Sequence, residues 1–375
     1  MFFAATIISI CYFSIIWGLI IGFETLKNIE NKNSTPKNTF SIIVPFRNEA
    51  ENLPTLLHSL SKIAYPKTLF EIILVNDASS DAYDSIIEAF KNKNPNINCT
   101  LINSNCVTNS PKKDALTTAI KIAKFNWIVT TDADCKVQKN WLNLFNQTIE
   151  DKNALFIAAP VKFKNETTFL HHFQNLNFIS LLGSTIGSFG LKKPILCNGA
   201  NLCYNKSTFI ELNGFKGNNA IASGDDIFLL EKITQKYPEK VCYLKATEAI
   251  VETYSEKNWK LFFNQQLRWA SKTTAYNSWF SKLVGLIVFI ENLLVLVLGV
   301  STLFISGYLK YFIIVFITKI TIDFILIFKT SVFFKNKKPL NYFALTSLIY
   351  PFFIVFITIN TLFKNYKWKD RSFKK

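Results

Sequence analysis

The sequence is poor in glycine, and no glycine lies between Gly22 and Gly183. In a P-loop or a dinucleotide-binding fingerprint, glycines let backbone N–H groups approach a phosphate closely. The glycine-free stretch therefore excludes both motifs. If a diphosphate binds in this stretch, a metal ion, lysine or arginine has to neutralise its charge.

Histidine is nearly absent as well. His58, His171 and His172 are the only three, which is too few for a histidine-rich metal site. The seven cysteines are scattered, and none forms a Cys-x-x-Cys pair. An odd, scattered set is typical of reduced cytosolic thiols rather than of a disulfide framework. His171 and His172 lie in an aromatic-rich stretch, where packing explains them more simply than metal ligation does.

Acidic residues are scarce relative to basic ones, with 26 Asp and Glu against 42 Lys and Arg, so the formal net charge is +16. The simplest interpretation is a surface that lies next to anionic lipid headgroups. No zinc-ligand spacing and no RNA-binding aromatic motif supports a nucleic-acid partner, and we expect none.

Long hydrophobic runs are abundant, and each has roughly the ~20 residues that cross a bilayer core. We therefore expect an integral protein of the cell inner membrane. The first run lacks the basic start of a signal peptide and is followed by lysines, which favours a cytoplasmic domain after it. We predict a transmembrane helix in residues 1–25, a cytoplasmic domain with interfacial helices in 26–282, and about three membrane segments with a basic tail in 283–375. The runs are Phe2–Phe23, Leu283–Tyr308, Tyr311–Phe334 and Tyr342–Phe363.

The number of membrane crossings stays open. If all four runs cross, the basic tail Lys364–Lys375 ends outside the cell, against the positive-inside tendency, although the Lys335–Lys338 cluster then lies inside as expected. Glu291, Lys319 and Asp323 interrupt the second and third runs. One of these runs can therefore lie at the interface or within a bundle instead.

Between the first and second runs, short apolar strand patterns alternate with helical patterns. Such alternation predicts a mostly parallel, Rossmann-like sheet with right-handed crossovers and a ligand site at the carboxyl ends of the strands. Polar residues follow the first, second and fourth strands: Arg47-Asn48-Glu49, Asn76-Asp77 and Asp132-Ala133-Asp134. The predicted strands are Thr39–Phe46, Phe70–Asp77, Cys99–Asn103, Trp127–Asp132 and Ala154–Val161, and the predicted helices are Glu51–Ile63, Asp81–Phe90, Lys112–Lys124 and Gln138–Glu150.

Asp132 and Asp134 are candidate metal ligands, because hard carboxylate oxygens suit Mg²⁺ or Mn²⁺ and such ions commonly bridge a protein to substrate phosphates. Taken alone, two acids in a turn are more often helix caps or solvated groups. The neighbouring motifs strengthen the functional interpretation.

An ordered set of motifs runs from residue 40 to residue 269. It comprises FSIIVPFRNEAENLPTLLHSL (Phe40–Leu60), EIILVNDASSD (Glu71–Asp81), PKKDAL (Pro111–Leu116), TTDAD (Thr130–Asp134), GANLCY (Gly199–Tyr204), SGDDIFLL (Ser223–Leu230) and QQLRW (Gln265–Trp269). Together they resemble the family 2 inverting glycosyltransferases of GT-A fold. Within this family they are similar to the membrane-bound branch with a Q-x-x-R-W motif, which includes cellulose, chitin and hyaluronan synthases and ceramide glucosyltransferase.

The resemblance implies a role for each matching residue. Asp77 would contact the nucleotide base, with Glu49 beside it. Asp132 would face the ribose and diphosphate, and Asp134, together with Asp132, would hold Mn²⁺ or Mg²⁺. Lys112 matches a donor-binding lysine, although Pro111 replaces the usual glycine and Lys113 competes for the role.

The resemblance also assigns the acceptor side and the Q-x-x-R-W helix. Asp226 would be the catalytic base, and Asp225, where the family usually has glutamate, would lie on the acceptor side. Gln265 and Arg268 would bind the donor diphosphate, with Arg268 also catalytic, and Trp269 would stack on the acceptor sugar.

Elementary chemistry agrees with these roles, but simpler alternatives remain. An inverting transfer needs a base near the acceptor hydroxyl, and a carboxylate is the reasonable choice where histidine is so scarce. Gln265, Arg268 and Trp269 share one helix face at spacings of three and four residues. Asp225 and Asp226 could instead be a helix cap favoured by the helix dipole. The other three could form an interfacial anchor with a snorkelling arginine.

We therefore expect a membrane-anchored, metal-dependent, inverting hexosyltransferase. It would move a sugar from a nucleotide-sugar, with a UDP-sugar favoured, to a membrane-associated or lipid-linked acceptor in cell-envelope glycan synthesis. A processive polysaccharide synthase of the same family is the alternative, although three C-terminal runs are few for a polysaccharide channel. From another class, a non-catalytic membrane sensor or scaffold that binds a nucleotide is possible, and a metal-dependent nucleotidyltransferase is less favoured.

Overall fold

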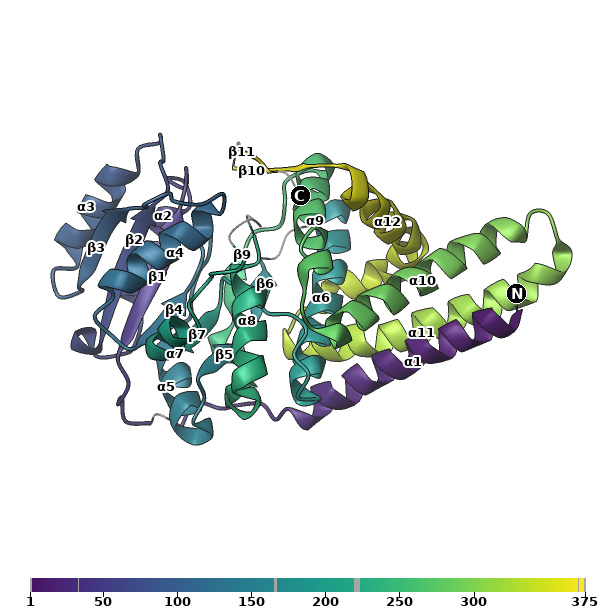
Figure 1. The fold of residues 1–375 in the computed structure, drawn as a ribbon, viewed down its shortest axis with the longest axis horizontal. Coiled ribbons are helices and arrows are strands. Elements are labelled where there is room, and N and C mark those ends of the chain that lie inside the picture. The colour runs from purple at the N-terminus through teal and green to yellow at the C-terminus, as the bar shows by residue number, and fades with distance from the viewer. Residues whose placement is uncertain (1, 33, 165–166, 219–222, 370, 374–375) are drawn as a thin grey trace. The chain divides into compact units, whose positions relative to one another are not determined.

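The computed structural model describes residues 2–32, 34–164, 167–218, 223–369 and 371–373 (Figure 1). The chain forms two compact units. Unit 2 comprises Lys27–Lys164 and Leu196–Tyr254, and unit 1 comprises Met1–Leu26, Asn165–Ile195 and Ser255–Lys375. The last two residues of the predicted basic tail, 374–375, lie outside the described residues.

Unit 2 is built on a seven-stranded sheet with the strand order β3-β2-β1-β4-β7-β5-β8. Strands β1 to β4 pair in parallel, and only β7 runs against its two neighbours. The predicted mostly parallel α/β fold is therefore confirmed. The strands are β1 (Phe40–Phe46), β2 (Phe70–Asn76), β3 (Cys99–Asn103), β4 (Trp127–Thr130), β5 (Phe156–Ala158), β7 (Leu202–Asn205) and β8 (Val241–Tyr243).

The central strands are apolar along their whole length because both faces of the sheet are covered, as is usual for parallel sheets. One buried acid interrupts this pattern. Glu71 accepts hydrogen bonds from the Ser41 hydroxyl and from the Lys124 backbone N–H, both at 2.6 Å. These bonds satisfy a carboxylate that would otherwise be costly to bury, and they join β1, β2 and the turn before β4.

The four helices predicted between the strands are all present, with bounds shifted by a few residues. Helix α4 begins at Pro111, a favoured first helical residue because its missing N–H has no partner in the first turn. It packs along β1 and β2 (Figure 1). The helices of unit 2 are α2 (Leu53–Ser61), α3 (Tyr83–Lys93), α4 (Pro111–Ile122), α5 (Trp141–Lys152), α7 (Lys206–Glu211) and α8 (Asp225–Lys236), with short 3₁₀ turns at Lys67–Leu69, Pro238–Lys240 and Thr247–Ala249.

The prediction of one strand over Ala154–Val161 was wrong. The segment forms β5 and then β6 (Val161–Phe163), which leaves the main sheet and pairs in parallel with β9 (Val251–Thr253). Pro160 separates the two strands. Because proline has no N–H for a sheet ladder, it ends β5, while its carbonyl accepts from Asn201 Nδ2 at 2.7 Å.

Unit 1 is mainly helical, and four of its helical segments are long and apolar enough to cross a membrane: Phe3–Thr25, Trp279–Ser301, Ser306–Phe333 and Lys338–Phe363. Two other helices, α6 and α9, belong to the same unit although they flank parts of unit 2 in the sequence. The elements are α1 (Phe2–Thr25), α6 (Phe169–Gly190), α9 (Trp259–Ala270), α10 (Trp279–Ser301), α11 (Leu309–Phe333) and α12 (Phe343–Phe363), 3₁₀ turns at Thr273–Ala275, Ser306–Tyr308 and Lys338–Tyr342, and a hairpin of β10 (Tyr366–Trp368) and β11 (Arg371–Phe373).

Helices α1 and α6 cross at glycine. A Cβ atom on Gly187 would lie 2.2 Å from the Leu19 carbonyl oxygen, and one on Gly190 would lie 1.8 Å from the Gly22 carbonyl oxygen. Both distances are too short for any side chain. Small residues that let helix backbones touch are a common basis of helix association in membranes.

The acids and the lysine that interrupt the apolar runs form a polar network inside unit 1. Glu291 of α10 accepts from the Ser9 hydroxyl of α1 at 3.1 Å. Asp323 of α11 accepts from Tyr12 of α1 at 2.5 Å and from Lys319 at 2.6 Å. The network therefore ties the N-terminal helix to two helices that follow it by almost three hundred residues, and polar groups in apolar helix bundles commonly pair in this way.

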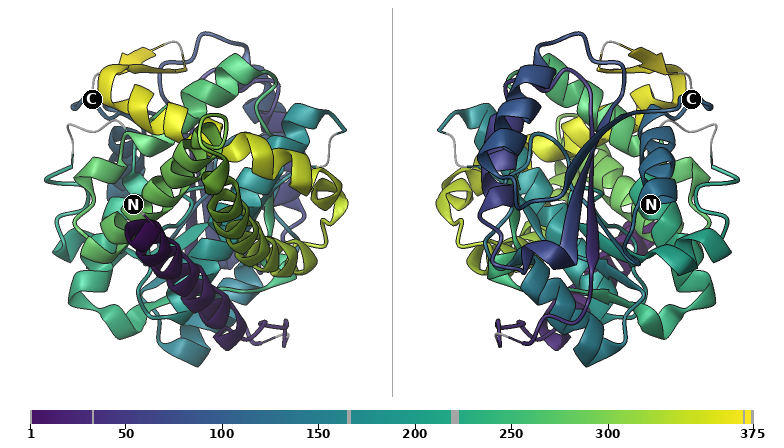
Figure 2. Two further views of the ribbon diagram at one scale, coloured as in Figure 1. Left: turned by 90° about the vertical axis from the view of Figure 1, so that its right-hand side faces the viewer. Right: turned by 90° about the vertical axis from the view of Figure 1, so that its left-hand side faces the viewer.

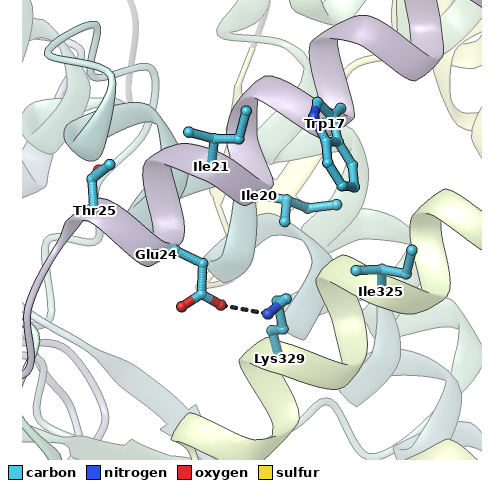
Figure 3. Close-up of a pocket in the computed structure, with 7 residues that line it drawn as sticks. All are labelled: Trp17, Ile20, Ile21, Glu24, Thr25, Ile325 and Lys329. Carbon is cyan, nitrogen blue, oxygen red and sulfur yellow. Dashed lines mark hydrogen bonds and ion pairs between the residues drawn. The ribbon is translucent and has the colours of Figure 1, made fainter.

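The C-terminal ends of α1 and α11 lie side by side. A shallow groove there is lined by Trp17, Ile20, Ile21, Thr25 and Ile325 (Figure 3). An ion pair closes the groove, with Lys329 Nζ 2.6 Å from Glu24 Oε1 (Figure 3). The ends of these two helices are therefore at the same level of the bundle.

Candidate active site

The first two loops after parallel strands are joined by one arginine. Arg47, which follows β1, donates from Nη1 to the carbonyl oxygens of Asp77 (2.9 Å) and Ala78 (2.7 Å), which follow β2. Asn48 and Ala78 both have φ of 52°, in the left-handed region, so both chains turn sharply at the strand ends. The expectation that polar residues meet at the carboxyl ends of the strands is met in unit 2.

Two predicted donor-binding carboxylates lie in these loops. Asp77 is buried, and its Oδ1 is 3.5 Å from the exposed Cys106 thiol. Glu49 is also buried, and its Oε2 accepts from Asn52 Nδ2 at 2.6 Å. Both carboxylates are held by neighbours within unit 2.

Lys112 connects the end of β4 with the start of α8. Its Nζ lies 2.6 Å from Asp132 Oδ1 and 3.7 Å from Asp225 Oδ2. Burial alone would lower the pKa of Lys112, but the carboxylates of Asp132, Asp225 and Asp226 outweigh it and raise that pKa above its ordinary value. Lys112, rather than Lys113, therefore occupies the carboxylate-lined position. Lys113 instead donates to the Asn218 carbonyl at 2.6 Å.

Gly199 lies directly beside these charges. A Cβ atom there would be 3.1 Å from Asp225 Oδ2 and 3.4 Å from Lys112 Nζ. The Gly199 N–H donates to Asp226 Oδ2 at 3.2 Å, and its carbonyl accepts from Thr130 at 2.8 Å. Asp226 also accepts from the Ile227 N–H at 2.8 Å. Backbone donors therefore fix the Asp226 carboxylate as a hydrogen-bond acceptor in the first turn of α8.

Asp134 is held by Thr253 of β9, whose hydroxyl donates to Oδ2 at 3.1 Å. Burial, followed by the nearby charges of Asp132 and Glu49, raises the pKa of Asp134 to about 6. Burial disfavours the ionised form of Asp134, and repulsion from the two neighbouring carboxylates adds to that effect.

The repulsion between these carboxylates bears on whether a divalent cation fits. Among the described residues, no group of three or more His, Cys, Asp or Glu side chains is arranged as a complete metal site. Asp132 and Asp134 nevertheless offer two hard oxygen donors in mutual repulsion, which a cation would relieve. Mg²⁺ and Mn²⁺ are commonly held by one or two carboxylates plus substrate phosphates, so the residues present fit such an ion.

The Q-x-x-R-W residues lie on α9 in unit 1. Gln265 Nε2 donates to Glu256 Oε1 at 3.0 Å, and the Trp269 ring packs 6.0 Å from that of Phe178. Burial raises the pKa of Glu256, and the positive charge of Arg268 acts against that rise. Gln265 and Arg268 thus share one face of α9, as their spacing predicted.

Three residues near the carboxylates were not identified from the sequence as site residues: Thr253, Thr130 and Cys106. Thr253 lies in a three-residue strand far downstream of Asp134, and no pattern in the sequence links the two. Thr130 ends a buried strand, and only the path of β7 brings Gly199 to it. Cys106 lies three residues after the end of β3, so its place near the strand ends was open to prediction.

The histidines play a packing role, as expected. His171 Nδ1 lies 3.0 Å from the Ser255 hydroxyl and Nε2 lies 3.3 Å from Asn175 Nδ2. The His172 ring stacks on Tyr342 with 4.3 Å between centroids. Both rings are therefore engaged within unit 1.

Known protein families match two overlapping parts of the chain. Residues 41–211 match the glycosyl transferase family 2, and residues 127–358 match the glycosyl transferase family group 2. The chain belongs to the family 2 glycosyltransferases. This confirms the family inferred from the motifs, whereas membership of the Q-x-x-R-W branch stays a prediction.

Two curated relatives are similar to parts of the chain. The poly(ribitol-phosphate) β-N-acetylglucosaminyltransferase TarS of Staphylococcus aureus is 34% identical over 126 residues, which is 34% of this chain and 21% of TarS. The poly-β-1,6-N-acetyl-D-glucosamine synthase of Staphylococcus epidermidis is 24% identical over 235 residues, covering 61% of this chain and 53% of the synthase. The chain thus spans about a fifth to a half of the length of these relatives.

A solved structure matches almost the whole chain. It is a mannosyltransferase from Pyrobaculum calidifontis in complex with GDP-Man and Mn²⁺, with a TM-score of 0.57, 14% identity, and coverage of 96% of this chain and 99% of the other. At this identity the likeness concerns the fold, and it agrees with the predicted GT-A type.

Proposed function

We propose that the protein is a membrane-anchored inverting glycosyltransferase that moves a sugar from a nucleotide-sugar to an acceptor hydroxyl. The observation that carries this proposal is the position of Lys112, within 2.6 Å of Asp132 and 3.7 Å of Asp225. Asp132 is proposed for the donor side and Asp225 for the acceptor side, and their contacts with one lysine support a shared site. Gly199 leaves the space beside them free of a side chain.

The donor would bind at the strand ends of unit 2. Asp77 and Glu49 are proposed to contact the nucleoside, and Asp132 the ribose and diphosphate. A UDP-sugar is the proposed donor, because the family resemblance favours it and a relative's name points to N-acetylglucosamine transfer. Lys112 would supply positive charge to the diphosphate that the glycine-free loops cannot neutralise.

Asp226 is proposed as the general base. The acceptor hydroxyl oxygen would attack the anomeric carbon from the side opposite the diphosphate, the bond from that carbon to the diphosphate oxygen would break, and the hydroxyl proton would pass to the Asp226 carboxylate. Attack from the opposite face inverts the anomeric configuration. Proton transfer to a positioned base typically contributes about 10²–10⁴-fold to the rate.

Asp132 and Asp134 are the residues that would hold Mg²⁺ or Mn²⁺. When bound, such an ion supplies positive charge to the leaving diphosphate. Besides burial, the charges of Asp132 and Glu49 raise the pKa of Asp134, and a cation bound between these carboxylates would offset their repulsion.

The acceptor and the membrane complete the proposal. Four helical segments long and apolar enough to cross a bilayer support an integral protein of the inner membrane with a cytoplasmic unit 2, and hence a membrane-associated or lipid-linked acceptor. Gln265, Arg268 and Trp269 are kept in the proposal on the strength of their motif, as diphosphate ligands and an acceptor-sugar platform. Asp225 is kept on the acceptor side.

A second candidate is a processive synthase of the same family. It is favoured by the similarity to poly-β-1,6-N-acetyl-D-glucosamine synthase over 61% of this chain. The two candidates differ in product size, because a processive enzyme releases long chains where a single-transfer enzyme adds one sugar per acceptor.

The test is incubation of membranes containing the protein with a panel of radiolabelled nucleotide-sugars, followed by lipid extraction and sizing of the product. We expect label from one donor, UDP-linked, in the lipid fraction. Asp226→Asn, in the first turn of α8, is the test variant. Glu239→Gln, which makes the same carboxylate-to-amide change at an exposed position after α8, is its control. Two outcomes contradict the proposal. One is that Asp226→Asn still transfers label to the lipid fraction, and the other is that none of the donors labels that fraction.

A further inference from the structure

We infer that α12 does not cross the membrane but lies along the surface of the leaflet that faces unit 2, with its apolar side in the lipid and its basic ends among anionic headgroups. Only α1, α10 and α11 then span the bilayer. The inference concerns how unit 1 occupies the membrane, and it does not depend on the reaction proposed above.

The first step concerns α6, which leaves unit 2 after Lys164 and returns to it at Leu196. The helix has 22 residues and is about 33 Å long. If it crossed the bilayer, the five residues between Gly190 and Leu196 would have to cross back. Five residues reach at most about 18 Å, which is less than the ~30 Å of a hydrocarbon core. Helix α6 therefore stays on the side of unit 2.

Helix α9 stays on that side as well. It begins at Trp259, five residues after unit 2 ends at Tyr254, and it has 12 residues, or about 18 Å. Such a helix is too short to span a bilayer. The two helices α6 and α9 therefore mark the unit 2 side of the membrane within unit 1.

Both the start and the middle of α12 contact these marker helices. Tyr342, just before α12, stacks on His172 of α6. Phe353, at the middle of α12, packs 5.2 Å from Phe173 of α6 and stacks at 5.2 Å on Phe262 of α9. In a spanning helix, the middle would instead lie halfway across the bilayer.

The end of α12 contacts α9 too. Phe356 packs 5.2 Å from Phe263 of α9, and Lys364, directly after α12, lies 5.7 Å from the same ring. The β10–β11 hairpin that follows also packs on α9, and its Tyr366 is buried. Figures 1 and 2 show α1, α10 and α11 running side by side and α12 crossing their direction. Start, middle and end of α12 therefore all contact α6 or α9, while Tyr350 between them also reaches the Lys319 ammonium of α11, which lies 5.6 Å from its ring centroid.

The outer face of α12 has the chemistry of a lipid-embedded surface. Its exposed large apolar side chains recur every three or four residues and so form one stripe along the helix. The stripe consists of Leu345, Leu348, Phe352, Phe356, Ile359 and Leu362, with Phe363 exposed beside it, and Phe356 lies at the edge of the stripe where it also touches α9.

Basic residues flank both ends of this stripe. The exposed lysines Lys335, Lys337 and Lys338 precede α12, and Lys364 follows it. If α12 crossed the membrane, these two clusters would lie on opposite sides of it. On an in-plane helix both lie in one headgroup layer, where each basic residue near an anionic surface is favourable.

This arrangement removes the conflict that the sequence left open. With three crossings, the basic segments before and after α12 lie on the same side as unit 2, as the positive-inside tendency requires. The exposed loop between α10 and α11 is then on the other side. That loop contains no Lys or Arg between Ser301 and Leu309.

Protease protection of epitope tags in the full-length chain tests the topology. One tag follows Lys375, a second is inserted in unit 2 after Asn94, and a third lies between Ser306 and Gly307. We expect the first two tags to be cleaved from the same face of the membrane, and the third from the opposite face. A C-terminal tag that is cleaved together with the Ser306 tag overturns the inference, because α12 would then cross.

A matched pair of lysine substitutions tests the lipid contact. Leu293 of α10 and Phe352 of α12 are both exposed apolar residues near the middle of their helices. Leu293→Lys places a charge deep in a spanning helix and should lower the amount of membrane-inserted protein about tenfold or more. Phe352→Lys should leave that amount near the wild-type level, because a lysine at the leaflet surface reaches the headgroups. Equal loss for both variants overturns the lipid-surface assignment even if the tags agree with it.

Discussion

Each unit of the protein contains a lysine–aspartate pair with the same 2.6 Å separation, in very different surroundings. In unit 1, Lys319 and Asp323 lie one turn apart on α11, with only 6% and 20% of their side chains exposed. In unit 2, Lys112 and Asp132 come from different elements, and 36% of the Asp132 side chain is exposed. The first pair is enclosed by apolar helices, whereas the second opens to solvent at the strand ends.

The comparison shows that the distance between two charges does not reveal their use. In unit 1 the Tyr12 hydroxyl also donates to Asp323, so the pair is satisfied by the protein itself and holds helices together. In unit 2, Lys112 faces Asp132, Asp225 and Asp226, and these carboxylates raise the pKa of Lys112 against the effect of its burial. An ion pair with several carboxylates around one lysine at a solvent-accessible edge is a candidate functional site, whereas an enclosed pair satisfied by its neighbours is a structural one.

The largest expected effects separate these two roles with one chemical change. Asp226→Asn should lower sugar transfer by about 10²–10⁴-fold, because the acceptor hydroxyl loses its base, with little change in thermal stability. Asp323→Asn leaves Lys319 without its carboxylate and should lower the free energy of unfolding by roughly 3 kcal/mol. Transfer per folded molecule should stay near normal in this second variant. Transfer assays and thermal unfolding in detergent measure both quantities.

The opposite results would contradict the roles assigned to the two aspartates. Normal transfer by Asp226→Asn would move the base to another group, with Asp225 the first to examine. A strong loss of transfer per folded molecule in Asp323→Asn would give the network in unit 1 a part in the reaction.

The next effect concerns Arg268 on α9. Arg268→Lys should slow transfer by about a hundred- to a thousand-fold if the guanidinium holds the leaving diphosphate, because a point charge cannot reproduce its planar, two-pronged contact. Lys260→Arg, an exposed position on the same helix, is the control and should be neutral. Near-normal transfer by Arg268→Lys at unchanged membrane abundance would leave α9 as an interfacial anchor.

Two glycines provide a smaller and more selective contrast. Gly187→Ala drives a Cβ into the Leu19 carbonyl and should destabilise unit 1 by about 1–3 kcal/mol in thermal unfolding. Gly285→Ala, with no atom within 4 Å of the added Cβ, is the control and should not destabilise the protein. Gly199→Ala should instead lower transfer several-fold with unfolding unchanged, because only the tips of Asp225 and Lys112 have to move. If Gly199→Ala lowered stability as much as Gly187→Ala, Gly199 would have a structural role rather than a role in transfer.

Metal removal should weaken donor binding, an effect that is measured separately from transfer and from unfolding. Calorimetric titration with UDP should show about tenfold weaker binding in the presence of a chelator, which corresponds to roughly 1.4 kcal/mol. Asp134→Asn should show the same weakening without chelator and no further change with it. Equal affinity with and without chelator in the unsubstituted protein would remove Asp132 and Asp134 from the metal assignment.

Much of unit 2 could be predicted because its signals are local. The runs Phe40–Phe46 and Phe70–Asn76 are apolar apart from Ser41, Glu71 and the final Asn76, and a strand buried on both faces of a sheet accommodates such runs. The prediction of one strand over Ala154–Val161 was wrong in its extent. The apolar pattern of this segment is continuous, but Pro160 has no N–H to donate to a sheet ladder, so the strand ends before it. The antiparallel β7 was not predicted, since four residues carry too little pattern to indicate a direction.

The sequence by itself determined the family, the parallel sheet and the aspartates at its carboxyl edge, because these depend on residue types at fixed spacings along the chain. Only the tertiary structure placed Thr253 against Asp134 and Lys112 between Asp132 and Asp225, because those residues are distant in sequence and meet only when strands pair and helices pack. It also brought α12 back to α6 and α9. Hydropathy describes how apolar a helix is, and the direction in which the helix runs depends on the side chains it finds to pack against.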